Sequence, residues 1–438
     1  MVDWEYVVVV FKGESSEACR LIMFGSNKDI YKKIDEVLEG INSRDLYPDI
    51  RTIEGKSIGN VVMIGGKKET LFCGYDYLGL GSNQELISEI QDGLESYGTQ
   101  SGGTPLVSGT LDVHKRAEES VSSLLGTEAA MLFTSGALAN IGVIPAIMSM
   151  PTFSAEFLIR KFLFLQQESY IFSDELNHAT IVDGCRLSKS KIIVYDHKNL
   201  DDLNTKIKHY RSGWKMIITD GVFSMDGDIA PLAGLAEIAK SNNSWLMVDD
   251  AHSVGVLGKT GAGTAEHLDL KGAVDITTGA LGKALSILGG YAAVSRKVSD
   301  YLRITARPGI FSGSIPPALA LGLIKSIEIV KKSQRLRENL WENAKQLRGG
   351  LKNLSLDTFY SEDPVPIVPL MIGEDMKAVV ISRKLQELGF FAPAIRWPAV
   401  PKGTARIRFT VQANNTRSEI SSLLNAIGKL DKEYKFSK

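Results

Sequence analysis

Cysteine is scarce in this 438-residue chain, which contains only three, Cys19, Cys73 and Cys185. They form no CxxC pair and no even set, so we expect neither a disulfide framework nor a metal site. This pattern is typical of a reducing compartment, and we expect the protein in the cytoplasm. No apolar run approaches the length of a membrane span. Asp3 and Glu5 precede the first apolar run, which argues against a signal peptide.

An excess of either charge is also missing. The chain has 50 Lys and Arg against 51 Asp and Glu, a formal net charge of -1. This balance does not favour nucleic acid or an anionic membrane as a partner. Hydrophobic residues make up 44% and charged residues 23%, as in an ordinary globular protein, and the length predicts two or three domains.

One lysine, Lys283, lies in a run of small residues at 277–285. It follows a short strand-like run at 274–276 and precedes two further glycines. Glycine allows the backbone to approach a bound group closely. A lysine partly removed from water titrates at a lower pH and becomes a usable nucleophile or base. The alternative is a simple loop lysine between a strand and a helix.

An acid and a histidine follow an apolar run about thirty residues upstream. Residues 245–248 end at Asp249, and His252 comes three residues later. Ligands of parallel α/β sheets bind beyond the carboxyl ends of the strands. Pyridoxal phosphate (PLP) chemistry needs a lysine for the aldehyde and an acid facing the pyridine nitrogen. The alternative is that Asp249 caps a helix and that His252 belongs to the core.

Further motifs follow these two in a fixed order from residue 70 to residue 425. Together they resemble the α-oxoamine synthases, which include 8-amino-7-oxononanoate synthase, 2-amino-3-ketobutyrate CoA ligase, 5-aminolevulinate synthase and serine palmitoyltransferase. The matching segments are YLGL at 77–80, SGG at 101–103, SGT at 108–110, SG at 135–136, DELNHA at 174–179, SMDGD at 224–228, DDAH at 249–252, GK at 282–283 and GTARIR at 403–408.

The resemblance implies an α/β protein of PLP-dependent transferase fold type I. We expect a mainly parallel seven-stranded sheet in a large domain and a smaller α+β C-terminal domain. The expected divisions are a β-hairpin extension at 1–26, a helix and strand segment at 27–70, the large PLP-binding domain at 71–320 and the small domain at 321–438. Within them we expect a helix at 27–44, a long helical stretch at 317–352, and strands at 365–371 and 406–411.

The resemblance also assigns the cofactor site. Lys283 binds PLP and acts as the base, His178 stacks on the ring, Asp249 faces the pyridine nitrogen and His252 orients the phenolic oxygen. The other expected contacts are Ser135, Gly136 and Ala137 at the phosphate, Ser224 near the phenolic oxygen, and Thr278, Ser312 and Ser314 as substitutes for two threonines. Those two threonines of the family are replaced here by Ala280 and Gly313.

For the substrate, the resemblance points to Arg408 as the carboxylate-binding arginine, with Arg396 and Arg406 as weaker candidates. Tyr75 stands at the substrate entrance and favours the serine palmitoyltransferase branch. The implied reaction condenses serine, alanine or glycine with an acyl-CoA or an acyl-carrier protein, in a homodimer, with loss of CO2. The alternatives are an aminotransferase or lyase of the same fold and a non-catalytic partner subunit.

Relative to this family, the chain has about seventeen extra residues within 148–170. Among residues 155–165 only three are charged, so apolar side chains would surround most of a helix there. Such a segment packs on its own domain or on the dimer partner, or it binds a long acyl chain, a carrier protein or a membrane surface.

Overall fold

The computed structural model describes residues 30–43, 47, 50–58, 60–149, 168–359 and 363–436. The predicted hairpin at 1–26 and most of the apolar insert at 148–170 lie outside these residues, and so does the docking surface predicted for the insert. Within the described ranges, no helix has the length and apolar character needed to cross a membrane.

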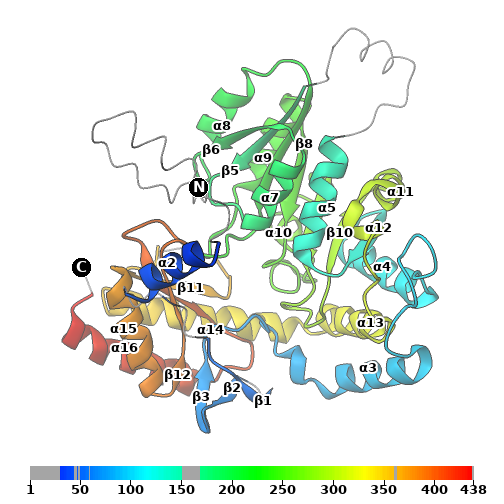
Figure 1. Ribbon diagram of the computed structural model, residues 1–438. Helices are drawn as coiled ribbons and strands as arrows, with labels where there is room; N and C mark the ends of the chain where they lie inside the picture. The colour runs from blue at the N-terminus through cyan, green and yellow to red at the C-terminus, as the bar shows by residue number, and fades with distance from the viewer. Residues whose placement is uncertain are drawn as a thin grey trace, which may run out of the picture.

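A seven-stranded sheet forms the centre of the larger part of the molecule (Figure 1). Only β10 runs antiparallel to its two neighbours, β4 and β9, while β9, β8, β7, β5 and β6 pair in parallel. The predicted fold class is therefore confirmed. In sheet order the strands are β4 (Ala129–Phe133), β10 (Gly290–Val294), β9 (Ile276–Ala280), β8 (Trp245–Asp249), β7 (Trp214–Asp220), β5 (Ser169–Asp174) and β6 (Lys191–Tyr195).

Successive side chains of the inner strands enter two different hydrophobic clusters. In β7, Met216 and Ile218 belong to one cluster and Ile217 belongs to the other. In β8, Met247 belongs to the first of these clusters and Leu246 to the second. This alternation buries both faces of the sheet, as the crossover helices of a parallel sheet require. The covering helices are α5 (Gly136–Met148), α7 (Ala179–Leu187), α8 (Leu200–Ile207), α9 (Leu232–Ser241), α10 (Thr264–His267), α11 (Arg296–Thr305) and α12 (Arg307–Ile310).

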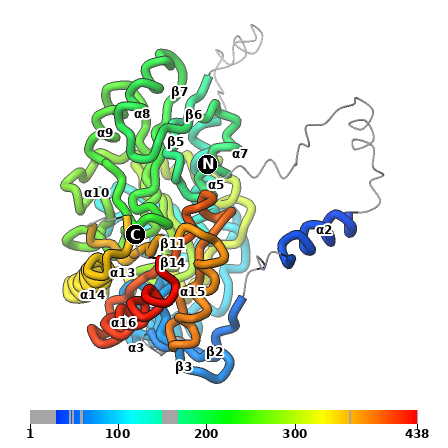
Figure 2. The backbone as a smooth tube through the Cα atoms, turned by 90° about the vertical axis from the view of Figure 1, so that its left-hand side faces the viewer, coloured from blue at the N-terminus to red at the C-terminus, as the bar shows by residue number. Residues whose placement is uncertain are grey.

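Long helices connect this sheet to the C-terminal part. The predicted helical stretch at 317–352 is two helices, α13 (Pro317–Lys332) and α14 (Gln334–Asn353), because the helix is interrupted at Ser333. Helix α13 packs on α3 (Gln84–Tyr97) and α4 (Asp112–Leu125). The predicted N-terminal helix is α2 (Ile30–Asn42), which has no buried residue and stands away from the body in Figure 2.

Two small sheets lie beside the C-terminal helices. The first combines N-terminal strands with a distant one, because β12 (Phe390–Phe391) pairs in parallel with β3 (Lys67–Leu71). In Figure 2 the blue N-terminal strands accordingly lie next to the orange and red C-terminal elements. The domain boundaries stay a prediction. The remaining elements are β1 (Glu54–Ile58), β2 (Val61–Ile64), η1 (Leu80–Ser82), β11 (Ile367–Gly373), β13 (Ala394–Ile395), β14 (Ala405–Thr410), α15 (Asp375–Glu387) and α16 (Arg417–Tyr434).

Candidate active site

Three parallel strands of the large sheet end in a buried aspartate. Asp174 ends β5, Asp220 ends β7 and Asp249 ends β8, and the latter two are paired in register. Carboxyl ends of parallel strands share one edge of the sheet, so these acids gather where α/β proteins bind ligands. Burial raises the pKa of Asp220 well above its ordinary value, and the neighbouring carboxylate of Asp249 raises it further.

Asp249 is held in place by a side chain from helix α5. Asn140 Nδ2 donates to Asp249 Oδ2 over 2.6 Å, and Asn140 Oδ1 accepts from the hydroxyl of Thr278 over 2.8 Å. The hydroxyl predicted to assist the phosphate, Thr278, thus lies against Asn140 beside Asp249. No role was predicted for Asn140 from the sequence. A single amide side chain buried in the otherwise apolar helix 136–148 was the signal that could have identified it.

Lys283 lies three residues beyond β9, in the connection to β10. Its backbone carbonyl accepts from Ser286 N–H over 3.0 Å. Burial lowers the pKa of Lys283, the carboxylates of Asp249 and Asp220 oppose this, and Arg408 adds to it. A lowered pKa increases the fraction of neutral amine near pH 7, which is the form that attacks an aldehyde or accepts a proton.

The N-terminus of α5 lies beside β9. Ser135 caps this helix, and its Oγ accepts from Leu138 N–H over 3.2 Å. A Cβ on Gly136 would come within 2.9 Å of the Ala280 Cβ, so only glycine lets the first turn lie this close to β9. The N–H groups of a first helical turn have no partner within the helix and favour an anion, so Ser135, Gly136 and Ala137 suit a phosphate.

Two other predicted phosphate contacts have partners within the chain. The hydroxyl of Ser312 donates to the Pro308 carbonyl over 2.5 Å, and that of Ser314 donates to the Gly109 carbonyl over 2.6 Å. Their part in binding the cofactor stays a prediction. The anion-binding helix end, the lysine of lowered pKa and the buried Asp249 together provide the donor set that PLP needs.

His178 caps helix α7 at the mouth of the site. Its N–H donates to Asp220 Oδ2 over 2.8 Å, and its Nδ1 is 2.8 Å from Thr180 Oγ1. Loss of surrounding water lowers the pKa of His178, while the Asp249 carboxylate opposes this and Lys283 adds to it. The side chain is therefore a neutral, flat ring at neutral pH.

His252 is fully enclosed, and its Nδ1 is 2.8 Å from the hydroxyl of Tyr77. Burial lowers the pKa of His252 far below its ordinary value, and the positive charges of Lys283 and Arg408 lower it further, so the ring is neutral. Tyr75, the tyrosine predicted from the sequence, is 55% exposed, whereas Tyr77, for which no role was predicted, is fully buried. Burial raises the pKa of Tyr77 to about 12.

Two arginines of β14 point to the loop that follows β7. Arg406 is paired with Asp226, and its Nη1 also donates to the Met225 carbonyl over 3.2 Å. Arg408 Nε donates to the carbonyl of Ser224. Within the described ranges, no carboxylate forms an ion pair with Arg408. Its guanidinium is thus the better suited of the two to bind a carboxylate from a substrate.

Arg396 follows β13, which pairs with β14 in the same small sheet. Strand β13 places Ile395 opposite Arg406 in the ladder. A role for Arg396 in substrate binding stays a prediction.

Comparison with known proteins identifies the family. Residues 67–427 match the model of the family described as aminotransferase class I and II. The chain is 40% identical over 397 residues to an 8-amino-7-oxononanoate synthase of Lysinibacillus sphaericus, covering 90% of this chain and 97% of the relative. An 8-amino-7-oxononanoate synthase of Thermoanaerobacter pseudethanolicus is 38% identical over 402 residues, with 91% and 97% covered.

Among solved structures, a serine palmitoyltransferase variant from S. paucimobilis with a bound PLP–myriocin aldimine superposes with a TM-score of 0.84 at 27% identity. The match covers 93% of this chain and all of that one. The buried acid, the lysine and the helix end described above thus lie in a fold that binds PLP in its relatives. The chain belongs to the aminotransferase class I and II family and, within it, to the α-oxoamine synthases, which are PLP-dependent acyltransferases.

Proposed function

We propose that this enzyme condenses alanine with a seven-carbon dicarboxylic acyl thioester to give 8-amino-7-oxononanoate. The observation that carries this proposal is the 38–40% identity to synthases of that name over 97% of their length. In that product, carbons 8 and 9 with the amine are alanine without its carboxylate, and carbons 1 to 7 are the dicarboxylic acyl group.

The reaction balances as follows. The bond between the alanine α-carbon and its carboxylate breaks, with loss of CO2. A bond forms between the α-carbon and the acyl carbonyl carbon, and the thioester C–S bond breaks. The sulfur leaves as a thiol after taking up a proton. CoA and an acyl-carrier protein are both thiols of this kind.

PLP, when bound, supplies an electron sink for the bonding electrons of the α-carbon. The amine of Lys283 would hold the aldehyde and then accept the α-proton, which its lowered pKa favours, and a proton would return to the α-carbon after CO2 has left. The carboxylate of Asp249, fixed by Asn140, would keep the pyridine nitrogen protonated. His178 would cover the ring face.

Around the rest of the ring, His252 and Ser224 would lie beside the phenolic oxygen. The first-turn N–H groups of α5, at Ser135, Gly136 and Ala137, would bind the phosphate.

The substrate carboxylate would bind Arg408. A guanidinium meets a carboxylate through two parallel N–H donors, and the charge of Arg406 is already balanced by Asp226. The Ser224 carbonyl, which accepts from Arg408 Nε, would leave the terminal nitrogens to face the substrate.

We also propose that the enzyme works as a homodimer in the cytoplasm, with residues from both copies at each site. Two-fold dimers are the commonest oligomers, and a shared site is what the resemblance implies. Sizing of the pure protein and assay of its fractions test this. A fully active monomer would contradict it.

A second candidate is the transfer of a long acyl chain to serine. Two observations favour it, namely Tyr75 at the expected substrate entrance and the superposition on serine palmitoyltransferase, although the identity there is only 27%. The lower identity makes it the weaker candidate.

A panel of substrates separates the two candidates. Purified holoenzyme is given alanine, serine or glycine with a seven-carbon dicarboxylic, a palmitoyl or an acetyl thioester, and thiol release is measured. The proposal predicts the highest kcat/KM for alanine with the dicarboxylic donor. Preference for serine with palmitoyl thioester would establish the second candidate, and amino transfer without thiol release would overturn both.

A further inference from the structure

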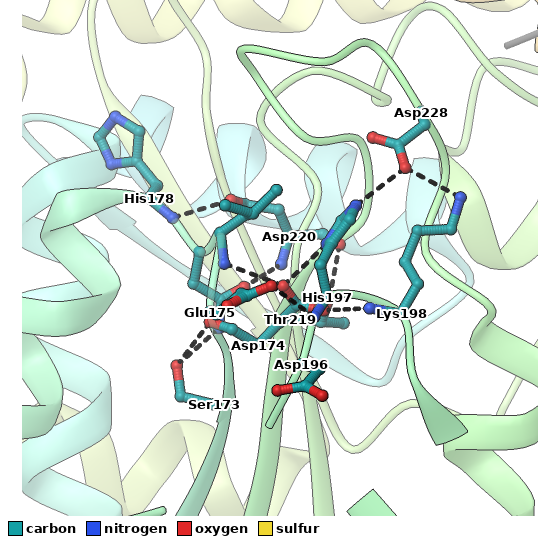
Figure 3. A network of polar contacts seen from close by, with 12 residues as sticks. Ser173, Asp174, Glu175, His178, Asp196, His197, Lys198, Thr219, Asp220 and Asp228 are labelled. Atoms are coloured by element: carbon teal, nitrogen blue, oxygen red, sulfur yellow. Dashed lines mark hydrogen bonds and ion pairs between the residues drawn. The ribbon is translucent and has the colours of Figure 1, made fainter. Parts of the chain in front are cut away.

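A histidine outside the cofactor site lies between two carboxylates. His197 Nδ1 is 2.9 Å from Asp174 Oδ1, and its Nε2 is 3.0 Å from Asp228 Oδ2 (Figure 3). Carboxylates only accept hydrogen bonds, so both contacts are satisfied only when both ring nitrogens carry a proton. The geometry therefore requires an imidazolium ion.

The charged groups around this ring support that state. Lys198 Nζ also reaches Asp228 Oδ2, over 2.9 Å, and Glu175 Oε1 accepts the backbone N–H of His197 over 3.0 Å. With Asp174, three carboxylates thus face one imidazolium and one ammonium. Burial alone would lower the pKa of His197, but the hydrogen bonds to Asp174 and Asp228 raise it to about 9.

Asp228 belongs to the loop at 221–230, which connects β7 to α9. The loop closes on itself through the bridge between Val222 and Ile229 and through Phe223 N–H, which donates to the Asp228 carbonyl over 3.0 Å. The ring of Phe223 packs edge-on against His197, with centroids 4.4 Å apart. His197 thus holds one side of this loop by charge and by packing.

The other side of the same loop carries the contacts to β14. The Ser224 carbonyl accepts from Arg408, and Met225 and Asp226 bind Arg406. A Cβ on Gly227 would lie 2.5 Å from the Ile367 carbonyl oxygen, so the backbone of the loop packs directly against β11 at this point. The position of Arg408 therefore depends on the loop, and the loop is tied to β5 and β6 through His197 and Lys198.

We propose that His197 is a positioning residue for the amino-acid substrate: its two ion pairs fix the loop 221–230 and thereby aim Arg408 at the substrate carboxylate. This inference rests on the proposed role of Arg408. It predicts that His197 acts on carboxylate binding in particular, whereas a purely structural residue would affect every ligand alike.

The test measures binding without acyl transfer. Amino acid is added to holoenzyme, and the change in visible absorbance of the bound cofactor gives an apparent Kd. His197→Gln, which keeps at most one of the two contacts, should raise the Kd for alanine about tenfold, as expected for loss of a charge-assisted hydrogen bond. Ethylamine is alanine without the carboxylate, and its Kd should change less than about twofold.

Two further variants complete the design. His209→Gln is the matched control, because His209 is exposed just beyond α8, its ring nitrogen Nδ1 contacts the nearby Thr205 carbonyl, and the substitution should leave both ligands unaffected. In an Arg408→Gln background, His197→Gln should add less than about twofold, because the group that it positions has been removed. If His197→Gln fails to fold, Asp228→Asn removes the negative charge from the same ion pair and should give the same selective loss.

The outcomes separate the two proposals. If unaltered holoenzyme shows no response to any amino acid, the proposed function fails and takes this inference with it. If unaltered holoenzyme binds alanine and the His197 and Asp228 variants bind it equally well, only the inference fails. Equal losses for alanine and ethylamine would also overturn it and leave His197 as a structural residue.

Discussion

Raising the pH through the range near 9 should reduce the stability that His197 gives to the folded enzyme. The pKa of His197 is raised in the folded chain from 6.5 to about 9, so the folded state holds a proton that the unfolded state releases. The contribution is complete below about pH 6.5 and is lost as the pH rises through about 9.

The magnitude follows from these two values. At 1.36 kcal/mol for each pH unit between them, the contribution is about 3 kcal/mol. The His197 side chain is 21% exposed, so solvent screens part of the charge, and this figure is an upper limit.

Urea unfolding measures this contribution. The unaltered enzyme, His197→Gln and His209→Gln are unfolded at about pH 6 and about pH 9.5, with protein and PLP concentrations held constant because both affect apparent stability. The stability margin of the unaltered enzyme over His197→Gln should shrink by as much as about 3 kcal/mol between the two pH values. The margin over His209→Gln should not change. A His197 margin that stays constant or grows with pH would refute the imidazolium assignment.

Three substitutions test other parts of the site. Asp249→Asn should still bind PLP but lose at least about tenfold in kcat, because a neutral amide no longer holds the ring nitrogen protonated. A tenfold loss corresponds to a rise of about 1.4 kcal/mol in the activation free energy. Turnover within about threefold of the parent enzyme would contradict this role of Asp249. Arg408→Lys should raise KM for the amino acid about tenfold or more, since an ammonium cannot bind a carboxylate through two parallel donors. An equal rise in KM for Arg406→Lys would contradict the assignment of carboxylate binding to Arg408 rather than Arg406. Ala280→Thr places a hydroxyl beside Gly136 and should tighten PLP binding about tenfold, as one hydrogen bond to a charged group allows. Spectroscopic titration of the apoenzyme with PLP measures this affinity, and unchanged or weaker binding would contradict the prediction.

Local pattern was enough to predict where Asp249 and Lys283 lie relative to the strands of the large sheet. The apolar run before Asp249 is a buried strand, and the acid stands at its carboxyl end because each strand of a parallel sheet ends at that edge. The small residues around Lys283 predicted a close approach of backbone, and the lysine lies in the connection 281–289 between β9 and β10. The same pattern ends β7 at Asp220, for which no role was predicted from the sequence.

The partners of these residues could not be read from the sequence, because they lie far away along the chain. Asn140 is separated from Asp249 by 109 positions and from Thr278 by 138, and Tyr77 is separated from His252 by 175. Each contact depends on the order in which the strands assemble. A single polar residue in an apolar helix indicates that Asn140 needs a partner, but it does not say which one.

The most direct test of acyl transfer with decarboxylation is to count both products in one reaction. Holoenzyme receives alanine labelled at the carboxyl carbon together with the seven-carbon dicarboxylic acyl thioester, and labelled CO2 and free thiol are measured over time. Acyl transfer with decarboxylation should give equal amounts of the two and an α-oxoamine product of matching mass. Thiol without CO2 would show simple thioester hydrolysis, CO2 without thiol would show plain decarboxylation, and either result would contradict the account.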